Sequence, residues 1–593
     1  MLQLQRSLPS VRSATRFPRR GVRRRGVFLI LVLVFIVVAT MAVYSFTDLM
    51  LAYDESVHLT ANRTQCVLAV ESGAEATRLI LAQPPASREE MGGVFDNPQI
   101  FRGINVVPGI AAADRVNYAI LAPNLDERGQ YAGIRFGLQN ESAKLNVNAL
   151  PALELSTGSI SPMLAAIDTL SPDFDSDNLA VSLLMGLPGM TIDVAEAILD
   201  WLDEDDDPRP NGCEADYYMT LPTPYTPKNG PIDSIEELLL VRGVTPELLF
   251  GVDSNRNGLV DAAEQQLGDV DPFGPLALGW VSFLTVYSME ANKRSDGSPR
   301  INVNQDDLEQ LYEQLLDATG NDDWASFIVA YRIAGQPGAT VGTAALSGAL
   351  GNAGIDNVPE TVGGLDEEVG LWTVDGLDEF DLSGGGGTNI TQILDLINAR
   401  VTVGEGGQQQ RLASPFFDDP VSMANYLPTL MGNLTTSNFT TMPGRINLNQ
   451  CPADLLRGIP LLDPDTIEDI IDARAQNSDT ENRQFETWPL VEGLVTTDQM
   501  RLLLPLLTAG GDVYRAQIVG FYESGNLYSR AEVVIDATTV NPKITFMRDL
   551  SHLGRGFDVA VLGIFAADVM GADASPAGSP APATSPSPAL PPQ

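Results

Sequence analysis

An unbroken apolar run near the N-terminus limits what this 593-residue chain can be. Residues 27–43 carry no charge, and these 17 residues are just long enough for a helix to cross a bilayer. The preceding 26 residues hold eight arginines and no Asp or Glu. Because basic residues stay on the cytoplasmic side, the pattern predicts one membrane helix with a cytoplasmic N-terminus and the bulk outside. A cleaved secretory signal is the alternative, but the run is long for one and no small-residue cleavage site follows it.

Charge and composition exclude several classes of protein. With 44% hydrophobic and 19% charged residues the chain is globular, and its length predicts two to four folded units. The net charge of −41 repels nucleic-acid phosphates and attracts cations, although solubility alone also explains it. Cys66, Cys213 and Cys451 form no zinc pattern and allow at most one disulfide, whose formation stays open. His58 and His552 leave no HExxH site.

A short motif with alternating asparagines occurs three times. It reads Lys-Leu-Asn-Val-Asn at 144–148, Arg-Ile-Asn-Val-Asn at 300–304 and Arg-Ile-Asn-Leu-Asn at 445–449. Asparagine suits helix N-caps, and an apolar pattern typical of helices follows each copy. With the tight turn Gly186–Gly189, the repeat predicts three helical modules of the helix-hairpin-helix, or SAM-like, type.

Strands are predicted on both sides of these modules. Residues 131–138 are typical of a strand, residues 513–521 and 529–535 of two strands joined by a turn, and residues 540–547 of a further strand. We expect these distant pieces to pair in one small antiparallel sheet, with the helical modules as an insertion. The Pro/Ala/Ser-rich residues 575–593 are predicted to be disordered.

Residues 253–264 fit the twelve-residue EF-hand loop. Such a loop offers oxygens at positions 1, 3, 5, 9 and 12 and a backbone carbonyl at position 7, with glycine at position 6 for the sharp turn. The predicted Ca²⁺ ligands are Asp253, Asn255, Asn257, Leu259, Asp261 and Glu264. Only a short helix can precede the loop, so we expect a structural calcium ion and not a switch. An acidic surface turn is the alternative.

The acidic run Asp203–Asp207, with Glu214 and Asp216, is a second candidate cation site. A solvated loop explains this run equally well, and the residues alone assign no ligands.

The junction between Gly26 and Val27 resembles a type IV prepilin or pseudopilin leader, in which a basic segment ends in glycine before an apolar helix. The resemblance implies cleavage between these residues by a prepilin peptidase, with the helix kept in the mature protein. Most pilins carry glutamate at the fifth mature position, where it neutralises the N-terminal amine of a neighbouring subunit. Here that position is Leu31, which suits a subunit at the end of a filament. An ordinary signal anchor with a chance glycine is the alternative.

Two longer stretches resemble the minor pseudopilin K of type II secretion systems. Residues 197–218 contain Ala-Ile-Leu-Asp-Trp and Asp-Tyr-Tyr, and residues 233–246 begin Asp-Ser-Ile-Glu-Glu-Leu. The resemblance is dense over 20–80 and 131–250 and looser over 445–495. It implies an α+β fold, with an N-terminal transmembrane and pilin helix, a pilin-like sheet and a large helical insertion.

The same resemblance implies a structural subunit without enzymatic activity or catalytic residues. It would act in pseudopilus assembly and in protein secretion across the outer membrane, at the tip of the pseudopilus. Its partners would be the I and J minor pseudopilins and the major pseudopilin. It would sit in the bacterial inner membrane with its bulk in the periplasm. The extra asparagine-marked module, the insertion after Gly251 and the Pro-rich tail depart from the family pattern and put the partner surfaces in doubt.

These observations divide the chain into consecutive segments. They are a leader (1–26), a transmembrane and pilin-like helix (27–82), the first part of a pilin-like domain (83–140), helical module 1 (141–250), an insertion with the calcium loop (251–299), helical module 2 (300–444), helical module 3 (445–510), the C-terminal strands of the pilin-like domain (511–574) and the tail (575–593).

Two other functions fit the residues less well. Helix-hairpin-helix modules often grip DNA, which would suit DNA uptake. Here Asp193, Glu196 and Asp200 flank the predicted hairpin and no Lys or Arg lies between 144 and 209, so contact with phosphates would be repulsive and no nucleic-acid partner is expected. A calcium-stabilised, membrane-anchored hydrolase would need a catalytic set, and no acidic pair stands out from the acidic surface.

Overall fold

The computed structural model describes residues 25–111, 114–153, 179–266, 271, 274–336, 370–404, 410–459, 461–476, 481–524 and 527–563. Most of the predicted leader, part of the predicted turn at 524–526 and the predicted disordered tail lie outside these residues. The chain divides into two compact units, residues 1–64 and 65–593.

The first unit consists of the N-terminal part of helix α1 (Arg25–Leu81). Its apolar side chains from Phe28 to Leu59 are exposed, and its first turn carries no acidic residue. Among the described residues, one helix is long and apolar enough to cross a membrane, and it is this one. The predicted long apolar helix is therefore confirmed.

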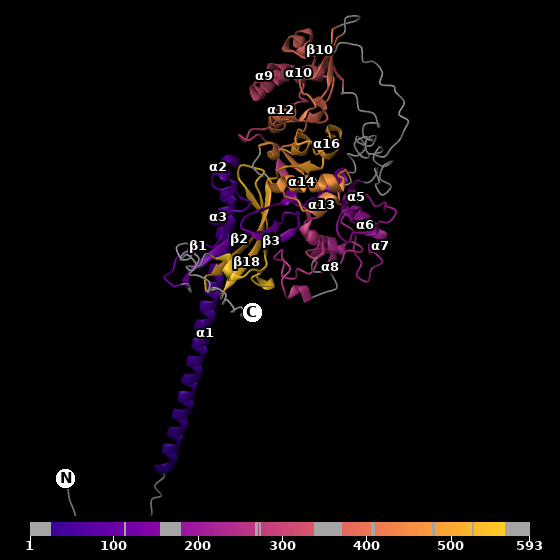
Figure 1. Ribbon diagram of the computed structural model, residues 1–593. Coiled ribbons are helices and arrows are strands. Elements are labelled where there is room, and N and C mark those ends of the chain that lie inside the picture. Colours follow the sequence, from indigo (N-terminus) through magenta and orange to yellow (C-terminus); the bar gives the residue numbers. More distant parts are fainter. Residues whose placement is uncertain are drawn as a thin grey trace, which may run out of the picture. The chain divides into compact units, whose positions relative to one another are not determined.

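The second unit contains an antiparallel sheet built from the two ends of the chain (Figure 1). Its order is β1-β2-β17-β18-β19, with β3 beside β2 and β4 beside β17. The predicted pairing of distant strands is confirmed, but the sequence did not predict the central strand β2. The strands are β1 (Ile104–Val107), β2 (Val116–Leu125), β3 (Tyr131–Arg135), β4 (Gln139–Asn140), β17 (Val513–Tyr522), β18 (Tyr528–Asp536) and β19 (Lys543–Asp549).

The end of α1 covers one face of this sheet. Val70 and Ala74 of the helix pack with Tyr118, Ile120 and Ile518, which alternate along β2 and β17. The intervening residues of those strands face the opposite side, where a separate apolar cluster lies. The centre of the sheet is thus buried on both faces, and the C-terminal residues Phe557 and Leu562 pack on the second face.

The three asparagine motifs form three copies of one structural device. The Leu-Asn or Ile-Asn of each motif is a two-residue strand that pairs in parallel with a later Leu-Thr dipeptide. The first asparagine accepts the N–H of the second, two residues on, and the second donates to the backbone of a later segment. The pairs are β5 (Leu145–Asn146) with β6 (Leu284–Thr285), β8 (Ile301–Asn302) with β13 (Leu434–Thr435), and β15 (Ile446–Asn447) with β16 (Leu507–Thr508).

The predicted capping role of these asparagines is largely wrong. Asn146 caps only a short 3₁₀ helix at 147–149, whereas Asp307 and Asn321 cap α9 and α10. The motif asparagines instead hold turns and loops. Each module nevertheless has two helices separated by a glycine-containing turn. They are α5 (Leu179–Met185) and α6 (Ile192–Leu202), α9 (Leu308–Thr319) and α10 (Asp322–Ala334), and α13 (Ala453–Arg457) and α14 (Pro464–Gln476).

The remaining regular elements are short, apart from α12. The helices are α2 (Pro85–Glu90), α3 (Pro98–Phe101), α7 (Ala215–Tyr218), α8 (Pro246–Phe250), α12 (Pro420–Asn433), α15 (Trp488–Val491), α16 (Thr497–Leu503) and α17 (Val559–Leu562), and the strands are β7 (Met289–Ala291), β9 (Gly335–Gln336), β10 (Gly370–Leu371), β11 (Arg400–Val403), β12 (Gln410–Ala413) and β14 (Thr441–Pro443). One continuous apolar core runs through the three modules.

Candidate calcium loop and the charged cavity beside it

The predicted calcium loop follows α8 and folds around its first and last ligand positions. The Asp253 carboxylate accepts the N–H groups of Asn257 (3.0 Å) and Gly258 (2.8 Å). Gly258 has a φ of 77°, which permits the sharp turn expected at position 6. At the other end, Glu264 accepts the N–H groups of Asn255 (3.1 Å) and Asp261 (2.9 Å). Both terminal carboxylates therefore point into the loop.

The two loop asparagines converge on a single oxygen. The side-chain amides of Asn255 and Asn257 donate to Oδ2 of Asp261 at 2.7 and 3.1 Å. Oδ1 of Asn255 is buried without a hydrogen-bond partner. Turning the Asn255 amide over would direct that oxygen, a hard ligand of the kind Ca²⁺ prefers, into the loop. The donor set thus fits calcium.

The electrostatics of the loop agree with this fit. Burial, together with the nearby Glu264 charge, raises the pKa of Asp253 to about 6. Asp253 and Glu264 share this site, and the two residues are only 7% and 3% exposed. Among the described residues, no group of three or more His, Cys, Asp or Glu is arranged to hold a metal by itself. Amide and carbonyl oxygens must therefore complete any calcium site here.

The loop is also fastened to the sheet. Nε2 of Gln517, in β17, donates to the carbonyl oxygen of Arg256 at 2.6 Å, and Arg530, in β18, donates to that of Asn255. The Asn257 amide donates to the carbonyl of Gly556 at 2.6 Å. These contacts could not be predicted from sequence, because they join residues more than 250 positions apart.

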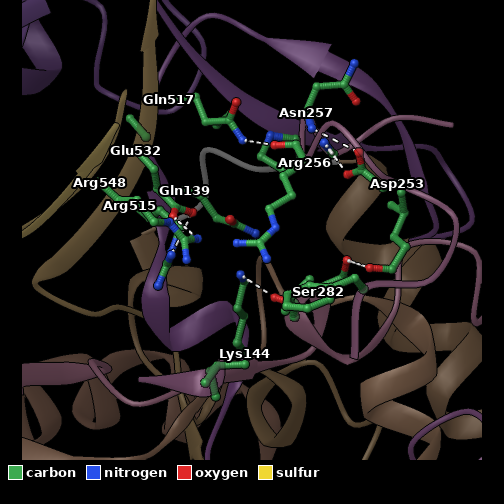
Figure 2. A pocket seen from close by; sticks show the side chains of 18 of the residues that line it. Gln139, Lys144, Asp253, Arg256, Asn257, Ser282, Arg515, Gln517, Glu532 and Arg548 are labelled. Carbon is green, nitrogen blue, oxygen red and sulfur yellow. Dashed lines mark hydrogen bonds and ion pairs between the residues drawn. The ribbon is translucent and has the colours of Figure 1, made fainter. Parts of the chain in front are cut away.

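A cavity of about 110 Å³ lies beside the loop (Figure 2). Its wall includes Arg515, Glu532 and Arg548 of the sheet and Lys144 and Glu236 of module 1. All of these groups except Lys144 belong to a chain of ion pairs that crosses from sheet to insertion. Arg515 pairs with Glu141 (2.5 Å) and Glu532 (2.8 Å), Arg548 with Glu532 (2.7 Å) and Glu236, and Arg256 with Glu236 (3.3 Å).

The second candidate cation site gathers only part of the predicted acidic run. Both carboxylate oxygens of Glu214 are buried without a partner, as is Oδ1 of Asp203. Burial and the charge of Asp200 raise the pKa of Glu214 to about 8. Arg209 binds Asp200 (2.7 Å) and Asp203 (2.5 Å). Residues 205–207 are exposed, and the charges of Asp205 and Asp206 add to the raised pKa of Glu214.

The other predicted residues have simple surroundings. Gly26 and Val27 lie in the first turn of α1, and Leu31 is exposed. Cys66, Cys213 and Cys451 are buried free thiols, and burial raises the pKa of Cys66 to about 11.

Comparisons with known proteins point to a bacterial secretion machinery. Residues 143–251 match the sequence model of the family described as "Type II secretion system (T2SS), protein K". A stretch of 55 residues is 40% identical to the "Type II secretion system protein K" of Pectobacterium carotovorum subsp. carotovorum. That match covers 9% of this chain and 17% of the relative.

A solved structure is also similar, the GspK-GspI-GspJ complex of the type 2 secretion system of enterotoxigenic Escherichia coli. The match covers 85% of this chain and 98% of the other, with 12% identity and a TM-score of 0.27, which is too low to establish a shared fold. The chain thus combines an apolar N-terminal helix and an antiparallel sheet with these sequence matches. Over these matched stretches the chain is similar to the type II secretion system protein K family.

Proposed function

We propose that this protein is a minor pseudopilin that helps to start pseudopilus assembly from the filament tip, with its N-terminus in the cytoplasm and its bulk in the periplasm. The observation that carries the proposal is the apolar start of α1. The first acidic residue after the leader is Asp48, so the helix offers no carboxylate to the N-terminal amine of another subunit. A subunit that cannot neutralise a neighbour stacked on it suits the end of a filament.

Maturation gives a direct test. We expect a prepilin peptidase to cleave after Gly26, so that the membrane-bound protein begins at Val27. Gly26→Val should leave the leader attached, because the peptidase would no longer find its glycine, whereas Gly21→Val in the same leader should be processed normally. N-terminal peptide mapping by mass spectrometry measures both. An intact leader on the wild-type chain, or a start after Val43, would contradict the pseudopilin assignment.

We propose that the partners are the I- and J-type minor pseudopilins, which the family resemblance implies, and that they pack on α1. Within the second unit, Leu68 and Leu79 of this helix are 52% and 55% exposed. Leu68→Asp with Leu79→Asp should abolish co-purification with I- and J-type subunits from the same genome. Leu371→Asp, at a leucine of similar exposure (61%) in the insertion, should preserve it. Co-purification that survives the double change would exclude this face as the contact.

We also propose that residues 253–264 bind a structural Ca²⁺ through Asp253, Asn255, Asn257, Asp261, Glu264 and the carbonyl of Leu259. The inward carboxylates, the partnerless Asn255 oxygen and the loop's hydrogen bonds to the sheet support this. The ion would rigidify the junction between sheet and insertion. We further propose that the three helix pairs are helix-hairpin-helix modules that act as structural spacers and do not bind DNA.

Calorimetry on the full-length protein in detergent tests the loop. We expect Ca²⁺ to bind and, at about a hundredfold excess over its Kd, to stabilise the fold by about 2.7 kcal/mol. Asp253→Ala with Glu264→Ala should remove one binding event, and Asp296→Ala, in an exposed turn, should remove none. An isotherm unchanged by the double substitution would remove the assignment. Any event that persists and is lost in Glu214→Gln would belong to the acidic cluster.

A further inference from the structure

We propose that the cavity between Lys144 and Arg256 is a binding site for a carboxylate group. The cavity lies where module 1, the calcium loop and the sheet meet, and it has a volume of about 110 Å³. This proposal goes beyond a role in pseudopilus assembly and does not require calcium to be bound.

The first observation is the state of Lys144. This residue is 6% exposed, and its Nζ donates to the carbonyl of Val281 at 2.9 Å. Among the described residues, no carboxylate lies within 4 Å of this ammonium group. An ammonium has three donors, so two remain for another acceptor. Burial, and next the charge of Arg515, lower the pKa of Lys144 to about 8, so the group is still mostly charged at pH 7.

The repeat supplies an internal comparison. Arg445 precedes the third asparagine strand as Lys144 precedes the first. Arg445 is bound by Glu290 at 2.5 and 2.6 Å and by Glu486 at 2.9 Å. The cation at this position of module 3 is thus saturated by carboxylates of the chain. In module 1 the corresponding cation lines the cavity.

The second observation is that two cations face each other across the space. Figure 2 shows the guanidinium of Arg256 and the ammonium of Lys144 extending into the cavity from opposite sides, with Gln139 beside them. Among the described residues, Arg256 has one ion pair, with Glu236 at 3.3 Å, and that carboxylate also binds Arg548. Glu141 and Glu532 act on the charge of Lys144, and Glu236, Glu532 and Asp253 act on that of Arg256. An anion between the two cations would be attracted by both.

The walls limit what can enter. Arg515 and Arg548 line the cavity but are already held by Glu532 and by other carboxylates. Much of the remaining wall is apolar, with side chains such as Leu121, Val281 and Leu284. A carboxylate on a short aliphatic stem matches both the charged end and the apolar wall. Such a group can come from a free organic acid or from the carboxyl terminus of a peptide.

The test is calorimetry on the full-length protein in detergent, with sodium acetate as the probe and sodium chloride at matched ionic strength. Acetamide, the neutral molecule of the same shape, is the second probe. We expect saturable binding of acetate and none of acetamide. Absence of saturable acetate binding to the wild-type protein, or equal binding of acetamide, would overturn the proposal without any variant.

Variants locate the site. Lys144→Met should weaken acetate binding roughly ten- to a hundredfold, because a charge-assisted hydrogen bond is lost. Lys293→Met is the matched control, since Nζ of Lys293 also donates to one carbonyl, that of Thr538 at 2.9 Å, but the residue does not line the cavity. A folded Lys144→Met protein that binds acetate like the wild type would overturn the assignment. N-acetylalanine distinguishes the sources, because tighter binding than acetate indicates a peptide terminus and weaker binding a free acid.

Discussion

Replacing Arg515 by methionine is expected to lower the free energy of unfolding by about 3–5 kcal/mol. Arg515 lies in β17 between Glu141, whose side chain is fully buried, and Glu532. The methionine keeps the volume of the side chain but leaves two buried carboxylates without their common counter-ion. This loss falls on the junction of sheet and insertion, because Glu141 leads into module 1 and Glu532 belongs to β18.

The same substitution should reverse the way in which the stability contributed by these carboxylates depends on pH. Although burial opposes it, Arg515 and Arg548 lower the pKa of Glu532 to about 2 in the folded protein. A lowered carboxyl pKa contributes stability above its unfolded value near 4.3 and loses it as the pH falls towards 2. Without Arg515, the pKa values of Glu141 and Glu532 should rise, because burial raises them and the charge that lowered both is gone. The variant should therefore recover stability relative to the wild type between about pH 7 and pH 4.

Urea unfolding at several pH values measures both effects. Arg115→Met is the control, because Arg115 pairs with Glu523 but is 35% exposed, and surface pairs contribute about 1 kcal/mol or less. If Arg515→Met lowers the free energy of unfolding at pH 7 no more than Arg115→Met does, the chain of ion pairs does not stabilise the junction of sheet and insertion. If the difference in unfolding free energy between the wild type and Arg515→Met increases as the pH falls, the expected direction of the pKa shifts is wrong.

The sheet could be predicted from sequence only where burial is one-sided or turns are strong. β17 and β18 were recognised as two strands joined by a turn. β2 was not, because residues Val116–Ala122 are all buried, and a strand covered on both faces shows no alternation. Helix α1 covers one face of β2 and a second apolar cluster covers the other. The alternation of buried and exposed residues that identifies a strand is therefore missing.

The repeat shows a similar limit. The asparagine motifs are visible because five consecutive residues match in type. Their Leu-Thr partners are dipeptides far along the chain, and two residues carry no periodicity. The inward carboxylates of Asp253 and Glu264 and the sharp turn at Gly258 could be predicted because these positions are local in sequence, whereas calcium binding stays a prediction. Lys144 and Arg256 meet only through the fold, so the cavity between them could not be anticipated.

Modules 1 and 3 touch through the glycines of their turns. Gly186, in the turn after α5, meets Gly458, in the turn after α13, so closely that a Cβ on Gly186 would overlap the Cα of Gly458. The obstacle is backbone, which cannot rotate away as a side chain can. We therefore expect Gly186→Val to cost about 3 kcal/mol, at the upper end of the usual cost of overpacking.

The equivalent turn of module 2 gives the control. Gly320 follows α9 with a φ of 61° and has open space around it. Asparagine tolerates this left-handed conformation, so Gly320→Asn should cost less than about 1 kcal/mol. Thermal unfolding of the two variants measures the difference. Equal losses of stability in the two variants would mean that each glycine is needed only for its own turn. A loss of stability in Gly186→Val alone would mean that direct backbone contact holds modules 1 and 3 together. Module 2 would then be attached independently of that contact.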